Sequence, residues 1–388
     1  MRKKILIFST AYEPFMSGAE VAVKEITDRL GESCEFFMIT ARMDKNLSKK
    51  EKIGNINVFR VGFGFKNLDK FLLPFCGLWV ALKNYKKENY QIVWSIMASQ
   101  ASIGASFFKI LKPQVKLLLT LQEGDEEEYL KRYVGGSDFL YRFLIQPWHL
   151  LVFHKADLIQ TISFDLKNRA LKNEVVCPIE VIPNGVDIEN FSQKYSVTEL
   201  DSLAKSLGKE EDDIFLVHTG RFNYKNGLED LIKSLIYLPL NIKLLLLGGG
   251  IDEEKLKEVV MERSLEKRVK FLGFINHQEL PKYLRISDIF VRPSLSEGLG
   301  NSFLEAMVVK LAVIATPVGG IPDFLKDEET GLFCIVHNPE SIAERVKKIL
   351  ADKKLKDYIV EKAYKMVIKK YDWNLIAVDM GKIFDSLV

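Results

Sequence analysis

Residues 289–307 read IFVRPSLSEGLGNSFLEAM, which is a β-rich apolar run, a glycine-rich loop and the start of a helical pattern. The apolar run Ile289–Arg292 has the length of a short buried strand, and we expect the helix to begin at about Asn301–Phe303. A strand that passes through a loop into a helix is the repeating unit of sheets with parallel strands. This segment therefore predicts an α/β fold.

The same alternation of strand and helix patterns extends along the whole chain of 388 residues. Val21, Val23, Ile26 and Leu30 follow the spacing of a buried helix face, and Gly31 ends that pattern. The rhythm predicts parallel sheets covered by helices on both faces. The runs expected to form strands are Ile5–Phe8, Glu35–Thr40, Val58–Val61, Ile92–Ile96, Lys116–Leu121, Leu158–Ile162, Val181–Ile182, Ile214–His218, Lys243–Leu247, Val269–Phe271, Ile289–Arg292 and Val313–Ala315.

A turn-rich segment, Ile182–Asp187, and the polar residues that follow it interrupt this alternation. The length of the chain also exceeds one ordinary domain. We expect two Rossmann-like, doubly wound domains, over residues 1–185 and 186–371, facing each other across a cleft. A final helix at 372–388 is expected to pack back on the first domain. Ligands of open parallel sheets bind at the carboxyl ends of the strands, so functional residues are sought in the loops that follow strands.

Composition narrows the class of protein. Charged residues make up 28% of the chain with a net charge of +3, which gives no sign of the dominant basic patch of a nucleic-acid-binding protein. The longest apolar run, Phe71–Leu82, contains Pro74 and Gly77 and is shorter than the ~20 residues that span a bilayer. The sequence predicts a cytoplasmic protein and leaves open peripheral contact with the inner face of the cell membrane.

Two carboxylates, Glu297 and Glu305, flank the glycine-rich loop that contains Gly298 and Gly300. Glycines let backbone amides approach a ligand, and the amino end of the following helix suits a phosphate. Carboxylates beside such a site accept hydrogen bonds from sugar or ribose hydroxyls, which suits a ligand with hydroxyls on both sides of a diphosphate. In the alternative interpretation, Ser302-x-x-Glu305 is a capping box in which Glu305 bonds only to the backbone.

Two cations follow the first strand of the second half, in the loop Gly220-Arg-Phe-Asn-Tyr-Lys-Asn-Gly227. Arg221 can bind a diphosphate through paired hydrogen bonds, and Lys225 can add a point charge. A solvated charged loop is the alternative. The strand that ends at Phe271-Leu-Gly-Phe274 offers backbone groups to a nucleobase edge.

These motifs resemble the retaining nucleotide-sugar glycosyltransferases of family 4, the glycosyl transferases group 1, which have the GT-B fold. The resemblance covers essentially the whole chain, and the spacing of the glutamate pair is quite specific. The matching segments are Pro14–Glu20, Ile182–Asp187, Gly220–Lys225, Phe271–Phe274, Ser287–Asp288, Glu297–Glu305, Pro317–Gly320 and Glu329–Phe333.

The resemblance implies a first domain on the acceptor side, a second domain that binds the donor, and a role for each matched residue. Arg221 and Lys225 bind the donor diphosphate and stabilise the leaving group, Glu297 binds the donor sugar, and these three form the catalytic set. Such enzymes retain the anomeric configuration, and a UDP-, GDP- or ADP-sugar is the co-substrate, with no cofactor and no metal. The donor-binding residues it implies are Gly18, Gly220, Phe274, Gly298, Gly300, Asn301, Ser302, Phe303 and Glu305.

The chain departs from the family pattern at three places. Asn226 holds the place of the family's lysine, and we expect the preceding Lys225 to serve instead. Ser17 replaces one of two paired glycines beside Gly18. Gln122 stands where a histidine commonly faces the donor sugar, and it cannot carry a proton. Ser17, Gln122 and the acidic Asp125 are candidates for contact with the sugar or the acceptor.

Two further hypotheses remain open at this point. A nucleotide-sugar epimerase or hydrolase would need a pair of residues that transfer protons. The absence of the family's histidine argues against such a pair. A binding module without turnover is consistent with Gln122 and Asn226.

The acceptor is expected to be a glycan or a lipid-linked molecule of cell-surface glycan or glycolipid synthesis. A basic and partly apolar face of the first domain suits an anionic lipid surface, the alternative being solvated helices over an ordinary core. The residues that suggest this face are Lys83, Lys86, Lys87, Lys109, Lys112, Lys116, Phe71, Phe75, Trp79, Phe107 and Phe108.

Overall fold

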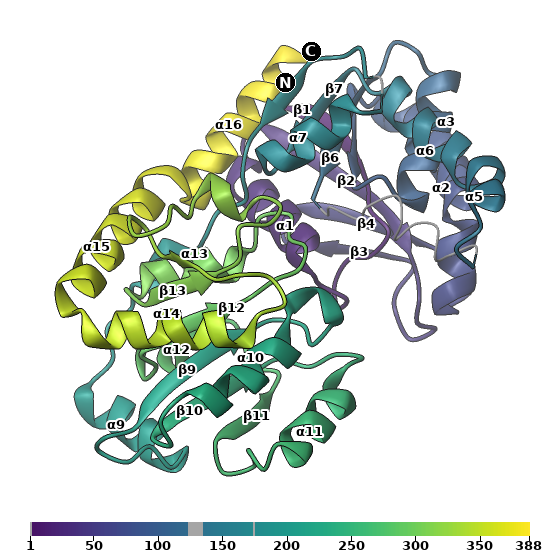
Figure 1. Ribbon diagram of the computed structural model, residues 1–388. Coiled ribbons are helices and arrows are strands. Elements are labelled where there is room, and N and C mark those ends of the chain that lie inside the picture. The colour runs from purple at the N-terminus through teal and green to yellow at the C-terminus, as the bar shows by residue number, and fades with distance from the viewer. Residues whose placement is uncertain (1, 123–134, 174) are drawn as a thin grey trace. The chain divides into compact units, whose positions relative to one another are not determined.

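The computed structural model describes residues 2–122, 135–173 and 175–388 (Figure 1). The chain splits into two compact units, Met1–Asn184 with Trp373–Val388, and Gly185–Asp372. The sequence predicts boundaries at residues 185 and 371, next to these limits. Each unit is built on a parallel sheet, so the predicted α/β class with two parallel-sheet domains is confirmed.

The first unit contains an eight-stranded sheet among its described residues, in the order β3-β4-β2-β1-β5-β6-β7-β8. Neighbouring strands are parallel except β3 and β4, which form an antiparallel pair. The strands are β1 (Lys3–Phe8), β2 (Cys34–Ala41), β3 (Lys50–Ile53), β4 (Ile56–Val61), β5 (Ile92–Ile96), β6 (Lys116–Leu121), β7 (Leu158–Thr161) and β8 (Ile179–Val181). The helices include α1 (Gly18–Leu30), α2 (Lys66–Glu88), α3 (Gln100–Leu111), α5 (Asp138–Leu144), α6 (Gln146–Lys155), α7 (Phe164–Leu171) and α16 (Trp373–Ser386).

Helices cover both faces of this sheet, as the alternating side chains of β1 show. Ile5 and Ile7 belong to the core that also contains residues of α1 and α16. Leu6 and Phe8 point the other way, into the core formed with α2 and α3. The last helix is part of the first unit because Phe384 of α16 packs against Trp94 of β5, with ring centroids 5.3 Å apart.

The second unit contains a six-stranded sheet among its described residues, in the order β11-β10-β9-β12-β13-β14, and all its neighbouring strands are parallel. The strands are β9 (Ile214–Thr219), β10 (Ile242–Leu247), β11 (Val269–Gly273), β12 (Ile289–Arg292), β13 (Ala312–Ala315) and β14 (Leu332–Phe333). The helices include α8 (Ile188–Phe191), α9 (Val197–Ser206), η2 (Tyr224–Asn226), α10 (Leu228–Ser234), η3 (Leu235–Tyr237), α11 (Glu253–Glu262), α12 (Leu280–Arg285), α13 (Asn301–Val308), η4 (Ile321–Asp323), α14 (Pro339–Ala351) and α15 (Lys353–Lys370).

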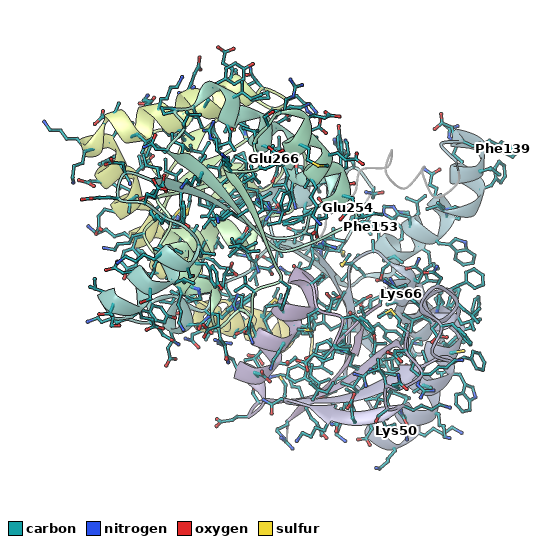
Figure 2. All side chains as sticks on the ribbon, turned by 90° about the horizontal axis from the view of Figure 1, so that it is seen from below. Lys50, Lys66, Phe139, Phe153, Glu254 and Glu266 are labelled. Carbon is teal, nitrogen blue, oxygen red and sulfur yellow. The ribbon has the colours of Figure 1, made fainter. Side chains whose placement is uncertain are left out.

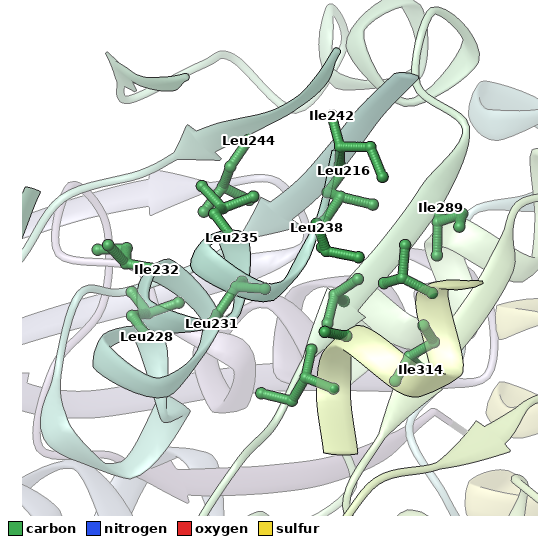
Figure 3. Packing of buried hydrophobic residues seen from close by; sticks show 14 of the residues in the cluster. Leu216, Leu228, Leu231, Ile232, Leu235, Leu238, Ile242, Leu244, Ile289 and Ile314 are labelled. Atoms are coloured by element: carbon green, nitrogen blue, oxygen red, sulfur yellow. The ribbon is translucent and has the colours of Figure 1, made fainter. Parts of the chain in front are cut away.

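The core on one face of this sheet joins β9, β10, β12 and β13 to α10, and Figure 3 shows its leucine and isoleucine side chains interdigitating. On the opposite face, Phe290 of β12 meets Phe303 of α13 edge-on, with ring centroids 5.5 Å apart. Every strand expected from the sequence is present. Within the described ranges, none of the helices combines the length and apolar character that crossing a bilayer requires.

Arg268, which precedes β11, is buried at the amino edge of the second sheet. Its guanidinium donates to four main-chain carbonyls, at 3.0 Å to Ile242, 2.7 Å to Leu235, 3.3 Å to Leu238 and 2.8 Å to Pro239. The side chain therefore provides hydrogen bonds for main-chain carbonyls from η3, from the connection that follows it and from the start of β10.

We expect the substitution Arg268→Met to lower the free energy of unfolding of the second unit by about 3 kcal/mol, because four carbonyls lose a charged donor. Urea denaturation measures this change. The matched control is Arg263→Met, at an exposed position of the same unit, which should be nearly neutral. Equal effects of the two substitutions would contradict the role given to Arg268.

His218 of β9 is fully buried, and burial together with the nearby charge of Arg292 lowers its pKa well below the ordinary 6.5. The folded protein thus keeps this imidazole neutral while the unfolded chain takes up a proton below about pH 6.5. The free energy of unfolding should therefore fall by about 1.4 kcal/mol per pH unit below that value, until the pKa of the folded state is reached.

Urea denaturation at pH values from 7 to 5 should show that the free energy of unfolding depends less steeply on pH in His218→Gln than in the unmodified protein. The control His154→Gln, at an exposed position, should keep the original slope; an unchanged slope for His218→Gln would refute the prediction.

Candidate functional site

The loops after β9 and β12 are in direct main-chain contact. The amide of Leu295 donates to the carbonyl of Lys225 at 2.6 Å. Gly227 has a φ of 65°, and a Cβ there would overlap the carbonyl oxygen of Pro293. Only glycine tolerates both conditions, so the loop that carries Arg221 is fixed against the loop that carries Glu297.

Glu297 is held through its main chain by the loop after β13. The amide of Gly320 donates to the Glu297 carbonyl at 3.1 Å. Gly319, with a φ of 54°, lies so close that a Cβ would overlap the same carbonyl oxygen. The Pro317–Gly320 motif therefore positions the backbone of a predicted site residue.

The helix that follows, α13, starts where the sequence predicts, but the capping-box interpretation of Glu305 is wrong. Gly300, with a φ of 88°, is the N-cap, and it has no side chain to cap the helix. Ser302 is therefore inside the helix, and its hydroxyl accepts a hydrogen bond from Arg292. The Glu305 carboxylate instead lies 3.0 Å from Nε2 of His277.

The contact between His277 and Glu305 was not predicted from the sequence. His277 follows β11, and its carbonyl accepts a hydrogen bond from Asn190 of α8 at 3.1 Å. Its ring meets Phe191 edge-on, with centroids 5.1 Å apart. No local pattern relates Glu305 to a histidine that far back in the chain, so only the fold reveals the pair.

Arg292 is the other residue that the sequence analysis missed as a site residue. It pairs with the Glu297 carboxylate. It also donates to Ser302 Oγ at 2.8 Å and to Asn226 Oδ1 at 2.8 Å. Its charge at the carboxyl end of an apolar strand is the sequence feature that could have identified it.

The remaining site residues predicted in the second unit differ in how exposed their side chains are. Arg221 is exposed and Lys225 is half-buried. Phe274 is 89% exposed, beyond the end of β11. Phe303 is a core side chain, so only its backbone is available to a ligand. The structure thus brings Gly220, Arg221, Lys225, Glu297, Gly298, Gly300, Asn301, Ser302 and Glu305 to the carboxyl edge of one sheet and the adjoining helix start.

Three predicted residues lie in the described part of the first unit. Ser17 forms a capping box with Glu20 at the start of α1, and its amide donates to that carboxylate at 2.8 Å. Gly18 is the first residue of α1, and space around it is open. Gln122 and Asn184 pair their side-chain amides reciprocally, at 3.1 and 2.7 Å. Asp125 lies outside the described residues.

In the part of the chain that the structure describes, no cluster of three or more His, Cys, Asp or Glu side chains is arranged to hold a metal ion.

Two family models match the chain in succession. Glycosyltransferase Family 4 matches residues 16–190, and Glycosyl transferases group 1 matches residues 201–366. Two uncharacterised glycosyltransferases of Methanocaldococcus jannaschii are similar. One is 32% identical over 58% of both chains, and the other is 26% identical over 100% of both. The first alignment therefore spans little more than half of that relative.

Solved structures show the same fold. Sucrose-phosphate synthase from Thermosynechococcus elongatus superimposes with a TM-score of 0.83 over 100% of this chain and 99% of that one, at 21% identity. HepE of Anabaena, in a complex with UDP-glucose, gives 0.78 over 99% of each chain at 18% identity. This likeness confirms the GT-B fold. With both family models matched in order, the chain belongs to glycosyltransferase family 4 and is a glycosyltransferase.

Proposed function

We propose that this protein transfers a sugar from a nucleotide-diphosphate sugar to an acceptor hydroxyl with retention of configuration. The observation that carries the proposal is the convergence, at one sheet edge, of a cationic loop, two carboxylates and a helix start. The cationic loop suits a diphosphate, the carboxylates suit hydroxyls, and the helix start suits phosphate oxygens.

In the proposed reaction, the bond between the anomeric carbon and the diphosphate oxygen breaks as the acceptor oxygen bonds to that carbon from the same face. The acceptor proton passes to the departing diphosphate. Arg221 and Lys225 carry positive charge toward the diphosphate, where negative charge develops, and so take the part that a metal ion plays in other transferases. Glu297 accepts hydrogen bonds from sugar hydroxyls, and Glu305 accepts them from the ribose.

For the donor we put UDP-sugars first, with GDP- and ADP-sugars as the alternatives. The support is the likeness of fold to HepE, which was solved with UDP-glucose. Consumption of the donor distinguishes a transferase from a binding module, and the formation of a new glycosidic bond distinguishes it from an epimerase or a hydrolase.

For the acceptor we propose a lipid-linked molecule, in cell-surface glycan or glycolipid synthesis, met at an anionic membrane surface. The support is an outward stripe on α2. Phe71, Phe75 and Trp79 are spaced at one-turn intervals and are 69%, 58% and 64% exposed. The core residues of α2, among them Leu73 and Gly77, lie on the other side. These aromatic side chains therefore do not belong to an ordinary core.

The stripe continues onto neighbouring helices. Phe107 of α3 contacts Phe75, with ring centroids 6.4 Å apart, and Trp148 of α6 at 6.0 Å. Phe139 of α5 points away from the ribbon (Figure 2). Aromatic rings of this kind settle at the boundary between lipid headgroups and acyl chains.

Lysines at the end of α2 add positive charge to this surface. Lys83 lies over the Trp79 ring, 5.1 Å from its centroid. Lys86 and Lys87 follow in the last turn. Lys109 and Lys116, which the sequence suggested for the same face, instead pair with Asp157, at 2.8 and 3.9 Å. Lys87 also pairs with Glu88, at 3.5 Å, and Lys112 lies 5.2 Å from the centroid of the Tyr85 ring of α2. The charge proposed to meet anionic lipid therefore comes from Lys83, Lys86 and Lys112.

The donor site is tested by thermal-shift titration with UDP, GDP, ADP and their sugars. A ligand at about a hundred times its Kd stabilises by about 2.7 kcal/mol, or roughly 5–10 °C for a unit of this size. Glu305→Ala should abolish that increase because the ribose loses its acceptor. Glu258→Ala, an exposed carboxylate on α11, is the control and should keep it. A full increase in the Glu305 variant would remove that residue from the site.

The membrane face is tested by sedimentation with vesicles that contain phosphatidylglycerol. Binding should be weak and should disappear in high salt, since each lysine near the surface contributes about 1 kcal/mol of screened attraction. The double substitution Phe71→Ser/Trp79→Ser should lower partitioning by about tenfold or more, because two apolar side chains no longer enter the interface.

The matched control for the membrane face is Val197→Ser/Leu240→Ser, which removes two exposed apolar side chains of the second unit. Binding that is absent, insensitive to salt, or equally reduced in the control would refute the membrane proposal.

A further inference from the structure

Arg292 ends β12 and is almost enclosed, with 12% of its side chain exposed. Its guanidinium contacts acceptors from three separate segments. These are Asn226 in the loop after β9, Glu297 in the loop after β12, and Ser302 in the first turn of α13. One planar group thus connects the segments that make up the candidate donor site.

Arginine is suited to this position in a way that lysine is not. The guanidinium offers five N–H donors in a fixed plane, whereas an ammonium is a compact point charge. The guanidinium also lies over the Phe303 ring, 5.4 Å from its centroid. The Phe303 ring therefore packs against the guanidinium, and the three polar partners bind its N–H groups.

Asn226 connects Arg292 to the main chain of Arg221. The side-chain amide of Asn226 donates to the Arg221 carbonyl, and its oxygen accepts from Arg292. Asn226 is buried, so this connection is sheltered from water. Asn226, which replaces the family's lysine, is therefore bonded to Arg292 at the end of the neighbouring strand β12.

The surrounding polar atoms distinguish this region from an ordinary core. Thr219 Oγ1, Asn223 Oδ1 and Ser294 Oγ are buried and have no hydrogen-bond partner in the described part of the chain. Thr219 is the last residue of β9, Asn223 lies in the loop that follows it, and Ser294 is two residues after Arg292. Buried polar groups without partners are uncommon, and they concentrate at functional sites.

We propose that Arg292 is a positioning residue of the donor site, which orients the Glu297 carboxylate toward the donor sugar and, through Asn226, fixes the Arg221 loop. The proposal rests on the proposed nucleotide-sugar function. Arg268 offers a contrast in the same unit, since it bonds only to main-chain carbonyls near the opposite, amino edge of the sheet. Its loss should destabilise the unit without changing how the donor sugar is bound.

The test measures the sugar's own contribution to binding. Calorimetry gives Kd for UDP and UDP-glucose, GDP and GDP-mannose, and ADP and ADP-glucose, and the pair that binds the unmodified protein is used. Arg292→Met should lower the ratio of nucleoside diphosphate Kd to nucleotide-sugar Kd by about tenfold. Glu297→Gln should do the same, and the double variant should lose no more than either, because both substitutions remove one function. Arg268→Met should lower the Tm and leave the ratio unchanged.

Arg292→Lys is the second variant, and it keeps the charge without the planar donors. Its ratio should stay close to that of Arg292→Met, and a ratio like that of the unmodified protein would overturn the positioning role. An unchanged ratio in Arg292→Met, or additive losses in the double variant, would also overturn it while leaving the donor function intact. If the unmodified protein binds none of the six probes, the proposed function itself fails, and this inference fails with it.

Discussion

The constraint on which the second unit depends is direct contact between backbone segments at the carboxyl edge of its sheet. Gly227 lies against the carbonyl of Pro293, and Gly319 lies against the carbonyl of Glu297. Both contacts need a residue without Cβ. These contacts join the loops after β9, β12 and β13. Main-chain contacts therefore determine where the loops that carry the predicted site residues lie.

Side chains add charge to this backbone arrangement. The Arg292 guanidinium occupies the space between the loops and neutralises the Glu297 carboxylate. Beside it, burial and that same positive charge lower the pKa of His218, so the imidazole adds no second cation. At the same sheet edge, Arg221 is exposed and Lys225 is half-buried. Arg292 therefore connects segments of the site, whereas Arg221 and Lys225 are the cations proposed to face a diphosphate.

Sequence reasoning predicted the architecture well because buried parallel strands are continuous apolar runs, and every such run became a strand. It missed β3 because Lys50, Glu51 and Lys52 are charged, and this strand exists only through antiparallel pairing with β4. The two-residue β14 is too short to carry a pattern. Long-range pairing, which sequence periodicity does not encode, accounts for both omissions.

In the candidate site, too, the features set by contiguous residues were predictable and the long-range contacts were not. The glycine loop and the helix start were predictable because their residues are contiguous. The partner of Glu305 was not, and the local match of Ser302-x-x-Glu305 to a capping box was misleading. Gly300 can adopt a φ of 88° and begins the helix earlier than Ser302. That single backbone conformation moves Ser302 inside the helix, where it accepts from Arg292, and leaves Glu305 free to meet His277.

The buried Arg268 and the nearly enclosed Arg292 lie at opposite edges of the sheet of the second unit. Arg268 satisfies main-chain carbonyls where η3 leads into β10, and such acceptors exist whether or not a ligand binds. Arg292, at the carboxyl end of β12, contacts an amide, a hydroxyl and a carboxylate, all of them side chains. Side chains can be reoriented by a ligand, whereas carbonyls within regular structure cannot. In open parallel sheets the carboxyl edge is where ligands bind, so the side-chain partners of Arg292 lie where the proposed donor would bind.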